Sequence, residues 1–170
     1  MLVIMAKYTK VIKKILKWEG GYAGNIDGMT CTMKGVTLAA YRKFFGKDKC
    51  CSDLKNITQA EWDLIFKEGY WDRWRADEIE NQSIANLLVD WCWASGYYGI
   101  VLPQRVLGVK DDGVVGNKTL AAINDYPDQE ELFWKLWNRR KRHFEDIAKN
   151  GKEKFLKGWL RRLDDFKYEE

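Results

Sequence analysis

Apolar and polar positions follow a helical period near the start of the chain. Val11 and Ile15 recur at the four-residue spacing of one face of an α-helix, and Glu19 continues that face one turn later. The glycines Gly20 and Gly21 follow at once. Glycine readily adopts the left-handed conformation that ends many helices. The pattern therefore predicts a helix that stops just after Glu19 and is closed by a glycine cap.

The same period predicts helices along most of the remaining chain. Thr37 precedes an apolar stretch as a helix cap, and Thr58 forms a capping box with Glu61. The segment IANLLVDWCWAS, which begins after Ser83, is apolar on most sides and is predicted to be the buried central helix. The predicted helices after the first span residues 38–45, 58–69, 83–96, 102–107, 118–124, 128–150 and 155–166.

One region lacks helical periodicity. Short, turn-rich segments surround Asp27 and Gly28 within residues 22–36, and they predict a small hairpin or irregular loop after the first helix. The fold class is therefore mainly α. A chain of 170 residues has the length of one domain with a full core, and no linker, repeat or low-complexity segment divides it.

The composition fits a soluble, helix-rich globular protein, with 46% hydrophobic and 32% charged residues. The net charge is +4, and basic residues gather at 139–142 and 161–162. Such runs indicate a solvated helix face or, alternatively, attraction to an anionic polymer such as nucleic acid or cell wall. No apolar run approaches the roughly 20 residues of a membrane span, so we expect no stable membrane insertion. The first residues lack a signal-peptide pattern, which predicts synthesis in the cytoplasm.

The cysteines and the histidine do not indicate a metal site. Cys31, Cys50, Cys51 and Cys92 show no C-x-x-C spacing, and His143 has no partner at ligand spacing. We therefore expect neither a metal nor another cofactor. Because cytoplasmic synthesis favours reduced thiols, free cysteines are expected rather than a disulfide.

Glu19 combines several features of a general acid. An apolar environment and the negative end of a helix dipole both disfavour an ionised carboxylate. A glutamic acid that stays protonated near neutral pH can protonate the leaving oxygen of a glycosidic bond. Glycosidases also need a group that activates water or stabilises the transition state, and Asp27 and Thr32 are the nearest candidates. The alternative is an ordinary helix-end glutamate that points into water.

The segment WEGGYAGNIDGMTCTMKGVTLAAY resembles the signature of family 108 glycoside hydrolases, the N-acetylmuramidases of bacteria and prophages. The shared pattern is E-G-G-[YF], a short loop with Asp and Gly, and then T-x-x-G-[IV]-T. The resemblance implies a lysozyme-like fold and hydrolysis of the β-1,4 bond between N-acetylmuramic acid and N-acetylglucosamine, with Glu19 as catalytic acid. Asp27 and Thr32 would hold the water if the reaction inverts configuration. This chain lacks the family's usual N-D-P and Gly-Gly pair, so Thr30 could stand in for Thr32 as the hydroxyl that positions the water. Otherwise Thr30 is expected to contact the substrate.

The resemblance continues along the chain. VDWCWASG resembles the family's Asp-containing helix, LPQRVLGVKDDGVVGNKTLAAIN resembles the companion segment called a predicted peptidoglycan domain, and FLKGWLRRLDDF is similar to the usual last helix. We therefore expect one lysozyme-like domain over residues 1–170. Its N-terminal segment, 1–96, carries the E-G-G-Y motif, and its C-terminal segment, 97–170, belongs to the same fold.

Three aromatic residues are predicted to contact the glycan. Tyr22 follows the glycine turn, and Trp71 and Trp74 lie in the segment YWDRWRAD. Large aromatic residues at helical spacing more often belong to the core, and Trp62, Trp91, Trp159 and Phe166 fit that interpretation.

The expected partner is a peptidoglycan glycan strand, with no nucleic acid, and the protein is expected to be a monomer. A protein made in the cytoplasm without a signal peptide would reach the wall, in the periplasm or outside the cell, by a route such as a holin, as a prophage lysin does. Two alternatives stay open. One is a non-catalytic peptidoglycan-binding or secretion-assisting protein on the same fold, and the other is a lytic transglycosylase, which forms an anhydro sugar without water.

Overall fold

The computed structural model of the protein describes residues 4–24 and 30–169, most of which are helical. The α-helices in these ranges are α1 (Tyr8–Trp18), α2 (Leu38–Phe45), α3 (Cys51–Lys55), α4 (Gln59–Phe66), α5 (Gln82–Ser95), α6 (Tyr98–Leu107), α7 (Asn117–Asn124), α8 (Gln129–Ala148) and α9 (Glu153–Asp164). Every helix predicted from the apolar period is present within a few residues of its predicted bounds. The mainly α class is therefore confirmed.

Two local features depart from the predicted helices. The helix predicted over 58–69 changes at Lys67 into a π-helical turn, Lys67–Trp71, and a short 3-10 helix, Ala76–Glu78, follows it. The five residues of α3 were not predicted, because a helix of little more than one turn is too short to show a period.

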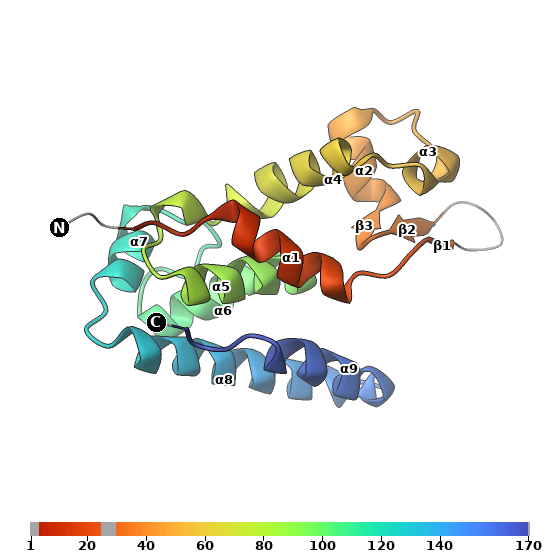
Figure 1. Ribbon diagram of the computed structural model, residues 1–170. Coiled ribbons are helices and arrows are strands. Elements are labelled where there is room, and N and C mark those ends of the chain that lie inside the picture. Colours follow the sequence, from red (N-terminus) through yellow and green to blue (C-terminus); the bar gives the residue numbers. More distant parts are fainter. Residues whose placement is uncertain (1–3, 25–29, 170) are drawn as a thin grey trace.

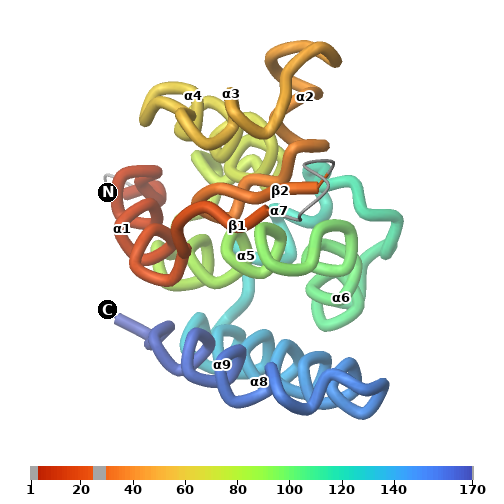
Figure 2. Tube along the Cα trace, turned by 90° about the vertical axis from the view of Figure 1, so that its right-hand side faces the viewer, coloured from red at the N-terminus to blue at the C-terminus, as the bar shows by residue number. Residues whose placement is uncertain are grey.

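Helix α5 lies at the centre of the molecule, as its apolar sequence predicts. Residues 83–92 are buried without interruption, and the helix packs against α1, α6 and α8. Figures 1 and 2 show α8 and α9 side by side on one side of α5, and α2, α3 and α4 together on the other. Trp62 and Trp91 lie fully buried in this core, as expected.

The predicted hairpin is confirmed as a small antiparallel sheet. Its strands are β1 (Ala23–Gly24), β2 (Cys31–Met33) and β3 (Val36–Thr37), in the order β1-β2-β3. Thr32, on the central strand, pairs with Ala23 of β1 on one side and with Thr37 of β3 on the other. The turn between β2 and β3 consists of Lys34 and Gly35, both with positive φ angles of 47° and 78°. Asp27 and Gly28 lie outside the described residues.

The helix caps follow the sequence except at the end of α1. The Thr37 hydroxyl accepts a hydrogen bond from the Ala40 N–H, and the Thr58 capping box with Glu61 is complete. The left-handed glycine cap predicted for α1 is wrong, since neither Gly20 nor Gly21 has a positive φ. The helix ends one residue earlier, where Glu19 takes an extended backbone with φ −85° and ψ 133°. Contacts of the Glu19 side chain with distant helices favour this conformation.

The expectation of free cysteines is wrong for one pair. Cys31 of β2 and Cys51 of α3 form a disulfide with a Cα–Cα distance of 5.9 Å, which ties the sheet to the short helix. The chain reversal through α2 brings these two residues together across 20 positions of sequence, and no local spacing signals it. Cys50 is free and exposed, and Cys92 is free and buried.

Two further features are absent from the described residues. In the ranges 4–24 and 30–169, no helix combines the length and apolar character needed to cross a bilayer. The same residues contain no group of three or more His, Cys, Asp or Glu side chains placed to hold a metal ion.

Candidate active site

The candidate site forms where α1 ends. Val11 and Ile15 are fully buried, so the apolar face of α1 packs into the core and carries Glu19 to its inner end. The Glu19 side chain is 10% exposed. Burial of a carboxylate is costly unless hydrogen bonds or an opposite charge compensate it, so its partners decide what it can do.

Two donors from distant segments hold the same oxygen of Glu19. The indole Nε1 of Trp93, near the end of α5, donates to Glu19 Oε1 at 2.7 Å. The guanidinium Nη1 of Arg162, on α9, donates to the same oxygen at 2.8 Å and forms an ion pair with it. The apolar environment expected around Glu19 therefore needs a correction, because the C-terminal helix places a charged partner there.

The β2–β3 turn closes over the other oxygen. A Cβ atom added to Gly35 would collide with Glu19 Oε2 and would lie 2.7 Å from both Glu19 Cδ and Trp93 Cζ2. Only glycine allows the turn to approach so closely, and its φ of +78° is also one that other residues rarely adopt. The turn therefore fixes the carboxylate from the side of the sheet.

Glu19 lines two cavities on either side of this turn. The first has a volume of about 410 Å³ and lies between the turn, the end of α5 and the pair α8 and α9. Its walls are Glu19, Gly35, Trp93, Ala94, Ser95, Phe144, Ile147, Lys152, Trp159 and Arg162. The second, of about 350 Å³, is lined by Leu16, Glu19, Gly20, Gly21, Lys34 and Gln59. A polymer could therefore approach the carboxylate from two directions.

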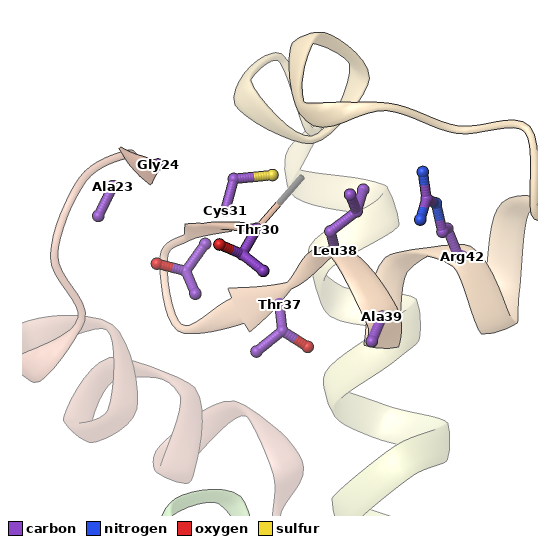
Figure 3. A pocket seen from close by; sticks show the side chains of 9 residues that line it. Ala23, Gly24, Thr30, Cys31, Thr37, Leu38, Ala39 and Arg42 are labelled. Atoms are coloured by element: carbon purple, nitrogen blue, oxygen red, sulfur yellow. The ribbon is translucent and has the colours of Figure 1, made fainter. Parts of the chain in front are cut away.

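A third cavity, also of about 410 Å³, follows the sheet. It is lined by Ala23, Gly24, Thr30, Cys31, Thr32, Thr37, Leu38, Ala39 and Arg42. Figure 3 shows these side chains around the strands, with Arg42 at the α2 end. Thr30 and Thr32 thus lie in the same cavity, whereas Glu19 lines the other two. The sheet connects them, because the Gly35 turn follows β2 directly.

Of the three aromatic residues expected at the glycan, one is accessible. Tyr22 is 40% exposed, and the Lys55 ammonium lies 5.4 Å from its ring centroid. Trp71 and Trp74 are fully buried, so the expectation that they contact the glycan is wrong. The π-helical turn directs this segment inward, where the Trp71 ring packs edge-on against Tyr8 at 5.6 Å.

Sequence reasoning did not single out Trp93, Arg162 or Trp159 for the site. Trp93 belongs to a helix interpreted as core, and Arg162 belongs to a basic run interpreted as a solvated helix face. One signal was present, because Arg162 follows Trp159 by three residues and so shares its helix face. Both residues line the larger cavity at Glu19.

A helical fold with a small sheet, and a glutamate held at the wall of an open cavity, fit the lysozyme-like class of glycoside hydrolases. The chain belongs to the glycosyl hydrolase 108 family, whose model, described as "Glycosyl hydrolase 108", matches residues 12–96. Residues 98–164 match a second model, described as "Predicted Peptidoglycan domain". The resemblance seen in the sequence is therefore confirmed. The protein is a hydrolase that acts on the peptidoglycan of the cell wall.

A solved structure supports the fold. The chain is similar to the structure described as "Structure of Brucella abortus SagA", with a TM-score of 0.74 and 24% sequence identity. The match covers 93% of this chain and 94% of that chain, and it shows a shared fold alone. No curated protein matches the sequence.

Proposed function

We propose that the protein is an N-acetylmuramidase that cleaves the β-1,4 bond between N-acetylmuramic acid and N-acetylglucosamine, with Glu19 as the general acid. The observation that carries the proposal is the position of Glu19. Within the described residues, both of its hydrogen bonds go to Oε1. Oε2 lies beside the Gly35 turn, between two cavities. From this position a protonated carboxyl group can give its proton to the leaving oxygen.

Asp27 and Thr32 are the proposed partners that hold the attacking water, with Thr30 as a further hydroxyl on the substrate side. Inversion of configuration requires room for water, so the two carboxyl groups of such enzymes lie about 6.5–9.5 Å apart. Asp27 lies outside the described residues. Support comes from Thr32, whose strand leads directly into the turn over Glu19. Tyr22, exposed just after the catalytic helix, is the proposed aromatic contact of the glycan.

The test is digestion of purified peptidoglycan by wild type and by Glu19→Gln, with the fragments identified by mass spectrometry. We expect reducing N-acetylmuramic ends from wild type and less than about 1% of that activity from Glu19→Gln, because the amide cannot donate the proton. Glu80→Gln, at an exposed glutamate away from the cavities, is the matched control and should keep full activity.

Each alternative outcome of the digestion would indicate a different function. Anhydro-muramic ends would identify a lytic transglycosylase instead. Absence of cleavage by wild type, with binding to peptidoglycan retained, would identify a non-catalytic wall-binding protein on the same fold. Activity retained by Glu19→Gln would remove Glu19 from the role of acid.

We also propose that the enzyme serves as a bacteriolytic prophage endolysin that acts as a monomer and depends on a holin for release. The basic charge of the chain supports attraction to an anionic wall polymer. Expression inside a Gram-negative host should leave the cells intact until a holin is co-expressed, and then lyse them. Lysis without the holin would contradict the proposed route.

A further inference from the structure

A second carboxylate, deeper in the molecule, is coupled to Glu19 through Arg162. Asp90, on α5, is fully buried. Its Oδ1 accepts hydrogen bonds from Arg162 Nη2 at 2.6 Å and from Arg162 Nε at 3.1 Å, so two donors of the arginine bind the same oxygen. Its Oδ2 accepts a hydrogen bond from Arg140 Nη2, on α8, at 2.6 Å. Arg162 Nη1 then reaches Glu19.

The charges in this cluster are balanced only when Glu19 is ionised. Two guanidinium groups surround the single carboxylate of Asp90, which leaves one positive charge in excess. Arg140 is itself fully buried, with its guanidinium carbon 5.2 Å from the Phe144 ring centroid. Its Nε and Nη1 atoms lack hydrogen-bond partners among the described residues. The Glu19 carboxylate is the group that neutralises the excess.

The neighbouring charges do not replace Glu19 in this role. Lys152 lines the larger cavity and Lys34 the smaller one, and both add positive charge. Asp165, the residue that follows α9, forms an ion pair with Lys17 at 2.6 Å. Trp93, from α5, contributes a neutral donor.

Burial outweighs the contact with Asp90 at Arg140 and lowers its pKa, whereas the charged neighbours favour the ionised forms of Asp90 and Arg162. Burial on its own would raise the pKa of Asp90, but Arg140 and Arg162 outweigh it and hold that pKa below the ordinary value. Burial on its own would lower the pKa of Arg162, but the carboxylates of Asp90 and Glu19 outweigh it and hold that pKa above the ordinary value.

We propose that Asp90 is a positioning residue that fixes Arg162 against Glu19. This inference rests on the proposed role of Glu19 as general acid. An acid that gives its proton to the leaving oxygen becomes a carboxylate in the transition state. Arg162 is placed to stabilise the carboxylate that forms, and the two hydrogen bonds to Asp90 Oδ1 keep it there.

Two substitutions test the coupling. Arg162→Gln removes a positive charge 2.8 Å from Glu19, so kcat should fall about 10- to 100-fold while KM changes little. Asp90→Asn leaves Glu19 in place but loosens the hold on Arg162, so kcat should fall in the same way. Because Asp90 acts through Arg162, adding Asp90→Asn to Arg162→Gln should lower kcat no further.

The experiment measures kcat and KM for release of reducing ends from purified peptidoglycan, with folding checked by circular dichroism. Arg162→Lys keeps the positive charge but loses the two-donor contact with Asp90, so its kcat should lie between those of wild type and Arg162→Gln. Arg161→Gln, exposed one residue earlier on α9, is the matched control and should leave both constants unchanged. If Asp90→Asn does not fold, Asp90→Glu takes its place, because it keeps the charge but displaces the oxygens that hold Arg162.

Wild-type kcat in a folded Asp90→Asn variant, or a further fall of kcat when Asp90→Asn is added to Arg162→Gln, would overturn the inference and leave the cluster a purely structural one. That result would not touch the proposed function as long as Glu19→Gln is inactive. An active Glu19→Gln would instead overturn the proposed function, and the inference with it.

Discussion

At the scale of single residues, the site depends on the contact between Gly35 and Glu19. The glycine has a φ of +78°, and any side chain there would strike both the carboxylate and the Trp93 ring. The turn can therefore hold the carboxylate from one side while Trp93 and Arg162 hold it from the other. A carboxylate restrained in this way loses little conformational entropy when substrate binds, which favours proton transfer.

Gly35→Ala should therefore impair both activity and stability. We expect a loss of about 10- to 100-fold in kcat/KM, because a displacement of the acid by about 1 Å has such an effect. The free energy of unfolding should fall by about 1 kcal/mol or more, because alanine is strained at positive φ. Denaturant titration and peptidoglycan turnover measure the two effects.

Gly158→Ala is the control for that substitution. Gly158 lies within α9, and nothing would lie within 4 Å of an added Cβ. An exposed helical glycine replaced by alanine should stabilise the protein by about 0.5–1 kcal/mol and leave turnover unchanged. Equal effects of the two substitutions would show that the Gly35 contact has no special role.

At the scale of elements, the disulfide joins the sheet to α3. Cys31 also lines the cavity at the sheet, together with Thr30 and Thr32, so the bond restrains one wall of the proposed substrate path. The sheet is short, with strands of two or three residues, and such strands have little stability of their own. The cross-link is therefore expected to contribute much of the order in this region.

Reduction of the disulfide should lower the free energy of unfolding by about 3 kcal/mol, the value typical of a loop near 20 residues. Cys51→Ser should abolish the dependence of the melting temperature on reductant. Cys50→Ser, at the neighbouring free and exposed thiol, should preserve it. If reductant did not change the melting temperature of the wild type, that result would contradict the structural role of the disulfide.

At the scale of the whole molecule, the two matched segments share one core. Helix α5, within residues 12–96, packs against α6 and α8, within residues 98–164. The ion pairs of Asp90 and Glu19 with Arg162 also join the two segments. We predict that the full chain unfolds in one cooperative transition, with equal calorimetric and van't Hoff enthalpies. Two separate transitions would contradict the single-domain prediction.

Local signals in the sequence were enough to predict most of the fold. The period of Val11 and Ile15 and the caps at Thr37 and Thr58 depend on residues within one or two turns, so the sequence displays them directly. The partners of Glu19 depend on contacts across 74 and 143 positions. Periodicity carries no information on such pairs, and the disulfide escaped prediction for the same reason.

The most direct measurement of the central claim is digestion of peptidoglycan in water enriched in oxygen-18, with mass spectrometry of the new glycan ends. A muramidase that uses Glu19 as acid and water as nucleophile should give N-acetylmuramic reducing ends that carry one heavy oxygen. Anhydro-muramic ends without the label, or reducing ends on N-acetylglucosamine, would contradict the account.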